Sequence, residues 1–359
     1  MRSESHLAAG FLLAAAASFS PASARPELKL DASGEVLAAD DISIQAHKLD
    51  FSVTQGDWIL DLGLGAGLYD IDYINAVFAS SARLEESTVL ADIAATRKWG
   101  RDWEATAGAN VYDGFADYRS VWLAEYYREN WTAFPAYRAP DPRGHAFALS
   151  GVWHYTPGAG RLDAGVSFGR DWVVPAWAFD PFVGAPVSSR EVLDTFSGRL
   201  GAEQALNGWL KTELTASYQS TSERDARFGV THSWAASAGP FALRISGGYS
   251  TEDPAFDAIY GNAAVEWNFL PTWTLTTRYQ LYHDTGEIAS SAFTASAPAL
   301  DTRELYFGLL WDRYDIALSL GVGFLEADYD PLSTENSFFG ALYRDRDWVN
   351  VRAAASFSF

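Results

Sequence analysis

Charged side chains of both signs occur among small residues on one face of segments whose alternate residues are apolar. Successive residues of an extended strand point to opposite faces, so this spacing gathers guanidinium, ammonium and carboxylate groups on one side. Such a face can orient dipolar solutes and bias ions, or it can pair its charges in salt bridges. The candidate residues are Arg199, Glu203, Lys211, Glu213, Arg227, Arg244, Glu266, Arg278, Glu304 and Arg352.

A hydrolytic enzyme would need a histidine close to a serine or a carboxylate. The candidates are His154, His232 and His283. His232 shares an apolar face with Trp234, which favours a position at an interface. His283 is followed by Asp284 and is the one histidine worth testing as a catalyst. A single His-Asp dipeptide is a weak signal, so we expect no catalytic site.

Two further motifs suggest ligand binding only superficially. Glu326, Asp328 and Asp330 lie on one side of an extended segment and could hold a divalent cation, but a solvated acidic loop is the simpler interpretation. The glycines between Gly63 and Gly67 lie inside a strand, without the Gly-Lys-Ser/Thr ending of a phosphate loop. The sequence predicts no metal site and no cofactor.

The composition excludes several classes of protein. The chain has 359 residues, is 48% hydrophobic and contains no cysteine, so disulfides cannot stabilise it. The formal charge of −20 argues against a nucleic-acid partner, because phosphates are neutralised by Lys and Arg. The sequence has 14 Trp, 17 Tyr and 22 Phe. This aromatic content must be explained by the fold.

Segments of ten to fourteen residues alternate with a two-residue period and are separated by turn signals. Residues 60–68 give the clearest pattern, and residues 348–359 repeat it up to a terminal Phe359. A soluble β-sandwich would alternate as well, but aromatic residues bracket nearly every tight turn. These rings are Trp99, Trp103, Tyr155, Trp209, Trp234, Phe241, Phe269, Trp273, Trp311 and Tyr314.

The chain resembles a bacterial outer-membrane β-barrel, although its motifs identify no specific family. The resemblance rests on the aromatic girdle, the closing strand that ends in Phe359, and an apolar leader at residues 7–17. It implies an all-β fold, a transmembrane antiparallel up-and-down barrel in the outer membrane. Outer-membrane lipid, lipopolysaccharide, the barrel assembly machinery and small polar solutes are the partners that it implies.

We expect a signal peptide at 1–24, with cleavage after Ala24, and a barrel at 58–359. Six tight turns, with one more strand at each end, give fourteen strands. Residues 25–57 are then a periplasmic arm or partial plug, or they contain an extra strand with a bulge at His47-Lys48. Sixteen strands is the alternative, with residues 118–128 as the second addition. Long loops are expected at 71–86, 116–143, 172–190, 285–301 and 327–347, and 116–143 could fold inward as a constriction.

Within this resemblance we expect a porin-like passive channel for small polar solutes, with the mixed-charge wall as its selectivity element. A second hypothesis is a non-conducting barrel that presents loops or supports a partner, its charges pairing across and plugging the lumen. A third is an outer-membrane lipid or peptide hydrolase.

Overall fold

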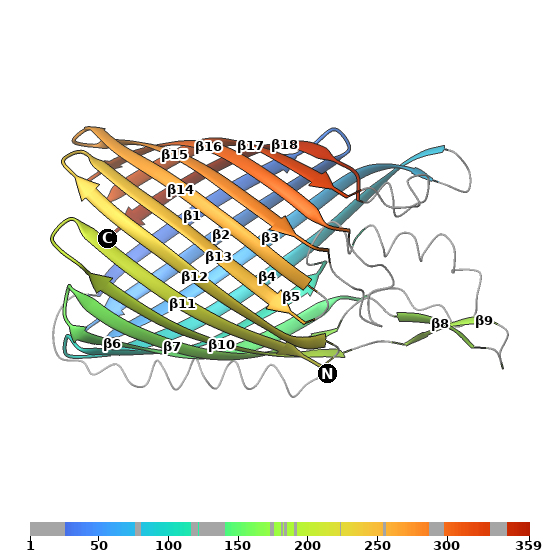
Figure 1. Cartoon of the computed structure of the whole chain (residues 1–359), viewed down its shortest axis with the longest axis horizontal. Helices are drawn as coiled ribbons and strands as arrows, with labels where there is room; N and C mark the ends of the chain where they lie inside the picture. Colours follow the sequence, from blue (N-terminus) through green and yellow to red (C-terminus); the bar gives the residue numbers. More distant parts are fainter. Residues whose placement is uncertain are drawn as a thin grey trace.

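The computed structural model describes residues 26–75, 80–115, 121, 141–172, 176–180, 182, 185–189, 192–222, 224–253, 256–286, 298–330 and 343–359. In these residues sixteen antiparallel strands close into a barrel (Figure 1). A separate two-stranded hairpin of β8 (Ala176–Asp180) and β9 (Ala185–Ser189) extends beyond one end. The predicted signal peptide lies outside the described residues.

The barrel strands follow one another around the wall in chain order. They are β1 (Glu27–Ala38), β2 (Ile42–Gln55), β3 (Trp58–Asn75), β4 (Ser80–Trp99), β5 (Trp103–Gly114), β6 (Arg143–Thr156), β7 (Gly160–Trp172), β10 (Val192–Ala205), β11 (Leu210–Thr221), β12 (Arg224–Ala238), β13 (Phe241–Glu252), β14 (Phe256–Leu270), β15 (Trp273–Asp284), β16 (Leu300–Arg313), β17 (Ile316–Tyr329) and β18 (Arg346–Ser358).

The expected count of fourteen strands is wrong, because β1 and β2 both belong to the wall. β1 pairs with β18 from Lys29↔Ser358 to Ala38↔Val349 and closes the barrel. Residues 27–55 are therefore a wall hairpin rather than an arm or plug. The suspected bulge at His47 is absent, since β2 pairs with both neighbours without a shift in register. The proposed extra strand at 118–128 lies outside the described residues, except for Val121.

The tight turns, the start of β1 and the end of β18 lie at one end of the barrel (Figure 1). Glycines with positive φ angles form several of these turns, including Gly56 at 60° in a turn that the sequence analysis missed. The turn between β16 and β17 lies at residues 314–315. Short turns mark the periplasmic end of such barrels, so the opposite end is extracellular.

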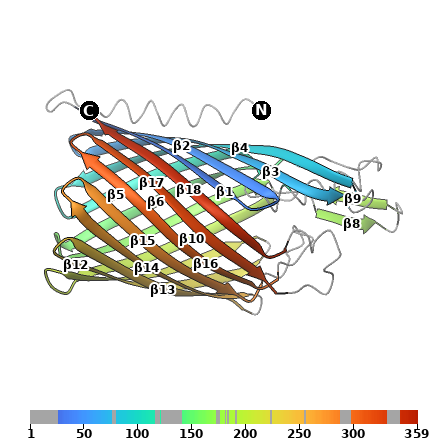
Figure 2. The same ribbon diagram turned by 90° about the horizontal axis from the view of Figure 1, so that it is seen from above.

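One predicted extracellular loop is instead largely strand. Residues 71–86 were expected to form a connection, but β3 and β4 remain paired as far as Asn75↔Ser80. The two strands extend past their neighbours at the extracellular end (Figure 2). The other long connections lie at this end, between the strands where they were expected.

The outer face of the barrel is apolar. Leu200, Leu149 and Leu320 remain more than 60% exposed there, as no soluble fold would leave an entire belt of such side chains. Hydrocarbon is the surrounding medium that makes this exposure favourable. Closure of the barrel pairs the backbone hydrogen-bonding groups of every strand and leaves no free edge. Among the described residues, no helix is long and apolar enough to cross a membrane.

The predicted aromatic girdle is present at the periplasmic end. Trp103 and Trp153 are cross-strand partners whose rings stack at 5.5 Å. The Arg97 guanidinium lies 5.3 Å from the ring centroids of both Trp58 and Trp99. Such rings are half hydrated and half buried in lipid, which fixes the depth of the barrel in the membrane.

We predict that Leu320→Arg, on the outer face of β17, lowers the free energy of unfolding by about 2–4 kcal/mol, because it moves a charge into hydrocarbon. The matched control is Ser319→Arg, whose side chain faces the lumen and should cost far less. Denaturant titration in lipid vesicles, followed by tryptophan fluorescence, measures both. Equal losses in the two variants would contradict the assignment of faces.

Candidate functional site in the barrel lumen

The strand register places all of the predicted charged residues on the inner face of the wall. Each pairs with inner-face neighbours, as in Arg199↔Ser217 and Arg352↔Glu35, whereas the exposed large apolar residues occupy the alternate positions. The two-residue period alone therefore located these side chains correctly. Their role in selectivity stays a prediction.

One group of inner charges spans β7, β10 and β11. Arg199 lies 3.6 Å from Asp163 on one side and 3.6 Å from Glu213 on the other. Lys211 Nζ lies 3.4 Å from Glu203 Oε1. These pairs join neighbouring strands, so each cation is neutralised by the wall beside it.

A second group crosses β15, β16, β18 and β1. The Arg278 guanidinium donates a hydrogen bond of 2.9 Å to Glu304, which lies 3.9 Å from Arg352. Arg352 also donates at 2.9 Å to Glu35 across the barrel seam. The Tyr306 ring lies between the two guanidinium groups, at 4.9 Å from Arg278 and 5.5 Å from Arg352. Cation–π contacts of this kind hold the ring against the wall.

The position of Tyr306 depends on a glycine in the adjacent strand. A Cβ atom at Gly321 would overlap the Tyr306 side chain, so only glycine lets the phenol lie flat across β17. This glycine therefore keeps a large ring out of the centre of the lumen.

The remaining predicted charges divide between a buried pair and two exposed side chains. Arg227 contacts the buried Glu252 at 2.9 Å and lies 3.9 Å from the ring of Phe256. Arg244 and Glu266 are exposed to the lumen, and no ion pair within 4 Å involves either of them in the described part of the chain. Arg244 is therefore an exposed inner cation that no described carboxylate within 4 Å neutralises.

Ion pairs among these inner residues follow the wall and do not cross the lumen. In the described ranges, each joins residues of one strand, of adjacent strands, or of strands one apart in the barrel order. Arg199 on β10 and Arg352 on β18 belong to opposite walls, and both are paired locally. In the described part of the chain, these ion pairs therefore do not bridge the lumen.

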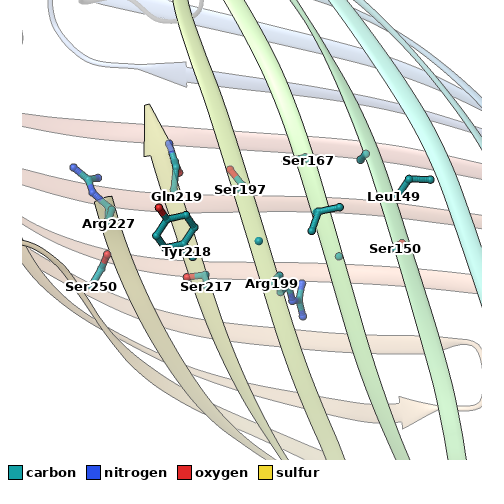
Figure 3. Close-up of a pocket in the computed structure, with 14 residues that line it drawn as sticks. Leu149, Ser150, Ser167, Ser197, Arg199, Ser217, Tyr218, Gln219, Arg227 and Ser250 are labelled. Atoms are coloured by element: carbon teal, nitrogen blue, oxygen red, sulfur yellow. The ribbon is translucent and has the colours of Figure 1, made fainter. Parts of the chain in front are cut away.

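Small polar side chains cover the inner wall from β6 to β13, which we call the serine wall. Figure 3 shows serines from five strands beside the side chains of Arg199 and Arg227. Glycines lie between them, and Gly229 leaves the space into which the Ser217 hydroxyl projects. A cavity of about 440 Å³ lies along this wall. The serines are Ser150, Ser167, Ser197, Ser217 and Ser250.

At the extracellular end, the inner face of the opposite wall is apolar. A packed group, here called the mouth cluster, fills this side and includes Val121, which is 0% exposed. Apart from Val121 and residues 141–143, the segment 116–143, for which an inward fold was one expectation, lies outside the described residues. The members are Ile42, Tyr69, Ile71, Tyr73, Phe115, Val121, Ala327, Tyr343 and Trp348.

An ion-pair clamp fastens the mouth cluster to the barrel seam. Arg346, whose side chain is 3% exposed, donates two hydrogen bonds of 3.0 Å to the Asp41 carboxylate. Arg344 lies 2.8 Å from the same carboxylate. Burial by itself raises the pKa of Asp41, but the hydrogen bonds and charges of Arg346 and Arg344 outweigh it and hold that pKa below its usual value.

The structure does not bring His283 and Asp284 together. His283 points outward and its Nδ1 lies 2.9 Å from Asp301 Oδ1. Asp284 points inward, where it accepts hydrogen bonds from the backbone amides of Gly286 and Leu300. Neighbouring strand residues face opposite sides, so a His-Asp dipeptide cannot act as a dyad here.

The other two histidines are far apart in the wall. His154 Nε2 lies 3.2 Å from Glu104 Oε1 on the inner face. His232 lies on the outer face, as expected, with its Nε2 2.8 Å from the Thr212 hydroxyl and its ring 4.9 Å from Trp234.

The acidic residues near the end of β17 do not form a cation site. Glu326 lies 3.6 Å from Arg303, which already neutralises it. In the described part of the chain, no group of three or more His, Cys, Asp or Glu residues could hold a metal ion.

The protein matches no protein-family model and no curated protein sequence. Among solved structures, it is similar to CdiB from Acinetobacter baumannii, with 10% identity and a TM-score of 0.55 over 92% of this chain and 60% of that one. The chain thus spans less than two thirds of CdiB. A bacterial polysaccharide outer membrane secretin has 10% identity and a TM-score of 0.53, over 92% and 98% of the two chains. Pseudomonas putida OprB at low pH has 11% identity and a TM-score of 0.49, over 100% and 98%.

At such low identity these likenesses describe the fold alone. The closed sixteen-stranded barrel, its apolar exterior and its similarity to outer-membrane proteins agree with one another. The protein has the fold of a bacterial outer-membrane β-barrel and belongs in that membrane.

Protonation of Asp41 is expected to release the clamp. A carboxyl whose folded-state pKa is lowered stabilises the fold above its unfolded pKa of about 3.9, and this stability is lost as the pH falls through the folded-state value. The backbone amides of residues 39–41 and 343–346 should therefore lose their protection against hydrogen exchange, measured relative to the intrinsic rate at each pH, in wild type only below about pH 4. Asp41→Asn should show the fast exchange already at pH 7. Slow exchange in Asp41→Asn at pH 7 would contradict the role of the clamp.

Proposed function

We propose that the protein is a passive channel for small polar solutes. The observation that carries this proposal is the direction of the lumen ion pairs, which follow the wall and do not cross the lumen in the described residues. Barrels of sixteen to eighteen strands are wide enough to enclose an aqueous passage. The serine wall adds hydroxyl groups that replace part of the hydration shell of a passing solute.

Among the described residues, carboxylates outnumber basic groups on the inner face, which favours cations. The inner basic residues are Lys29, Lys48, Lys98, Arg161, Arg199, Lys211, Arg227, Arg244, Arg278, Arg346 and Arg352. The inner carboxylates are Glu27, Asp31, Glu35, Asp50, Asp61, Glu86, Asp92, Glu104, Asp163, Asp171, Glu203, Glu213, Glu252, Glu266, Asp284, Glu304 and Asp312. The excess attracts cations into a confined passage.

One observation favours the alternative of a non-conducting barrel. The mouth cluster packs apolar side chains inside the extracellular end, where a hydrophobic constriction can stop conduction by excluding water. This cluster occupies the side formed by β1–β5, β17 and β18, whereas the serine wall lies on the other side. We therefore place the passage off the barrel axis, along the serine wall.

We also propose that the barrel assembly machinery inserts the protein into the outer membrane.

Single-channel recording of the refolded protein in a planar bilayer tests conduction. We expect stable current steps, and we expect Ser217→Trp to reduce their size by roughly half because the indole fills part of the serine wall. Ala216→Trp is the matched control, because Ala216 is next to Ser217 in the chain and its side chain faces lipid. Silence of the wild type would support the non-conducting barrel, and equal currents in both variants would remove the serine wall from the passage.

Selectivity should depend on the exposed Arg244. Arg244→Glu replaces a positive charge by a negative one, so we expect the cation-to-anion permeability ratio to rise by roughly two- to fivefold. The reversal potential under a salt gradient measures this ratio. Arg244→Lys keeps the charge and serves as the control. A reversal potential that is the same in Arg244→Glu as in wild type would mean that Arg244 does not face the permeating ions.

A further inference from the structure

Charged residues on the outer face begin at a well-defined height. Arg170 lies ten residues from the start of β7 at Gly160, and Arg303 lies ten residues from the end of β16 at Arg313. Ten residues of a tilted strand rise about 25 Å, which is the thickness of the apolar band of such barrels. These charges therefore lie at the outer-leaflet headgroups.

Three basic residues and one tryptophan on β6 and β7 lie together at this height. We call them the rim cluster: Arg143, His145, Arg170 and Trp172. The register pairs Arg143 with Trp172 and His145 with Arg170. The Arg143 guanidinium lies 5.2 Å from the Trp172 ring, and the His145 ring lies 5.6 Å from it. The indole thus holds two nitrogen-bearing groups side by side on the outer face.

Among the described residues, Arg143 differs from the other arginines of this rim in having no carboxylate partner within 4 Å. Arg83 pairs with Asp70, Arg170 with Asp194 and Arg303 with Glu326. The Asp113 residue is opposite Arg143 in register, yet no ion pair within 4 Å joins them. Stacking on Trp172 orients the guanidinium while its N–H groups remain available to an anionic acceptor.

An aromatic row lies directly below the rim cluster in the apolar band. Phe147, Phe168 and Phe196 are consecutive cross-strand partners on β6, β7 and β10. Their side chains are 59%, 43% and 46% exposed on the outer face. An anionic headgroup at Arg143 would place its acyl chains along these rings.

We propose that the rim cluster binds one phosphorylated glycolipid of the outer leaflet, with a phosphate on Arg143 and His145 and acyl chains on the phenylalanine row. Planar guanidinium groups bind phosphate oxygens in a bidentate way, and Arg143 is already oriented for this geometry. The site lies on the lipid-facing surface and is independent of solute passage through the lumen.

Native mass spectrometry of the refolded barrel with bis-phosphorylated lipid A tests the proposal. We expect Arg143→Gln to weaken binding about tenfold, the loss of one charge-assisted contact. Arg303→Gln is the matched control, since it removes a rim arginine that already pairs with Glu326. Arg143→Lys retains the charge without the bidentate geometry, so its affinity for lipid A should lie between those of wild type and Arg143→Gln. If Arg143→Gln does not refold, Arg143→Lys provides the test.

Dephosphorylated lipid A and phosphatidylglycerol separate the possible sources of binding. The proposal predicts weak binding of both, and unchanged channel conductance in Arg143→Gln. Equal binding of lipid A with and without phosphate would overturn it, as would equal losses in Arg143→Gln and Arg303→Gln. Equal binding of phosphatidylglycerol would overturn the assignment to a glycolipid.

Discussion

Backbone hydrogen bonding between β1 and β18 is the interaction on which the rest of the structure depends. A hydrocarbon surrounding offers no partner to a free strand edge, so the sheet must close on itself. The pairing of residues 29–38 with 349–358 supplies that closure and sets the number of strands. The strand number in turn sets the width of the lumen, and the register decides which side chains enter it.

In the closed wall, side chains alternate along each strand between an apolar outer face and a polar inner face. The outer positions carry exposed leucines and rings, while the inner positions carry the ion pairs and the serines. The inner ion pairs form within the wall and do not reach across the lumen, while Arg244 and Glu266 remain outside any ion pair in the described part of the chain. The two ends of the barrel differ, since the girdle anchors the periplasmic end and the mouth cluster narrows the extracellular one.

The sequence was sufficient to predict the β-barrel, its girdle and the inner position of Arg199, Arg278 and the other charges, because these follow from alternation along single strands. The β1 strand was missed because its acidic and polar composition resembles an arm, although Leu28, Leu30 and Val36 alternate. Ion-pair partners such as Arg352 and Glu35 are 317 residues apart in sequence, and only the register between strands brings them together.

The mouth cluster could not be predicted for a related reason. Ile42, Tyr69 and Ile71 occupy inner positions where alternation leads one to expect polar residues. Their apolar character is explained only by partners such as Phe115 and Trp348 from distant segments. By contrast, strand alternation alone implies that the side chains of His283 and Asp284, as successive residues of β15, lie on opposite sides of the wall.

The pairing of the first strand with the last also constrains how the protein folds. Hairpins form between neighbours in the sequence, but the closing contacts have the largest sequence separation of any strand pair in the barrel, so their loop-closure entropy makes them slow to form. Until they form, β1 and β18 each expose an unpaired edge that can template aggregation. An assembling chain must therefore be shielded until its two outermost strands meet.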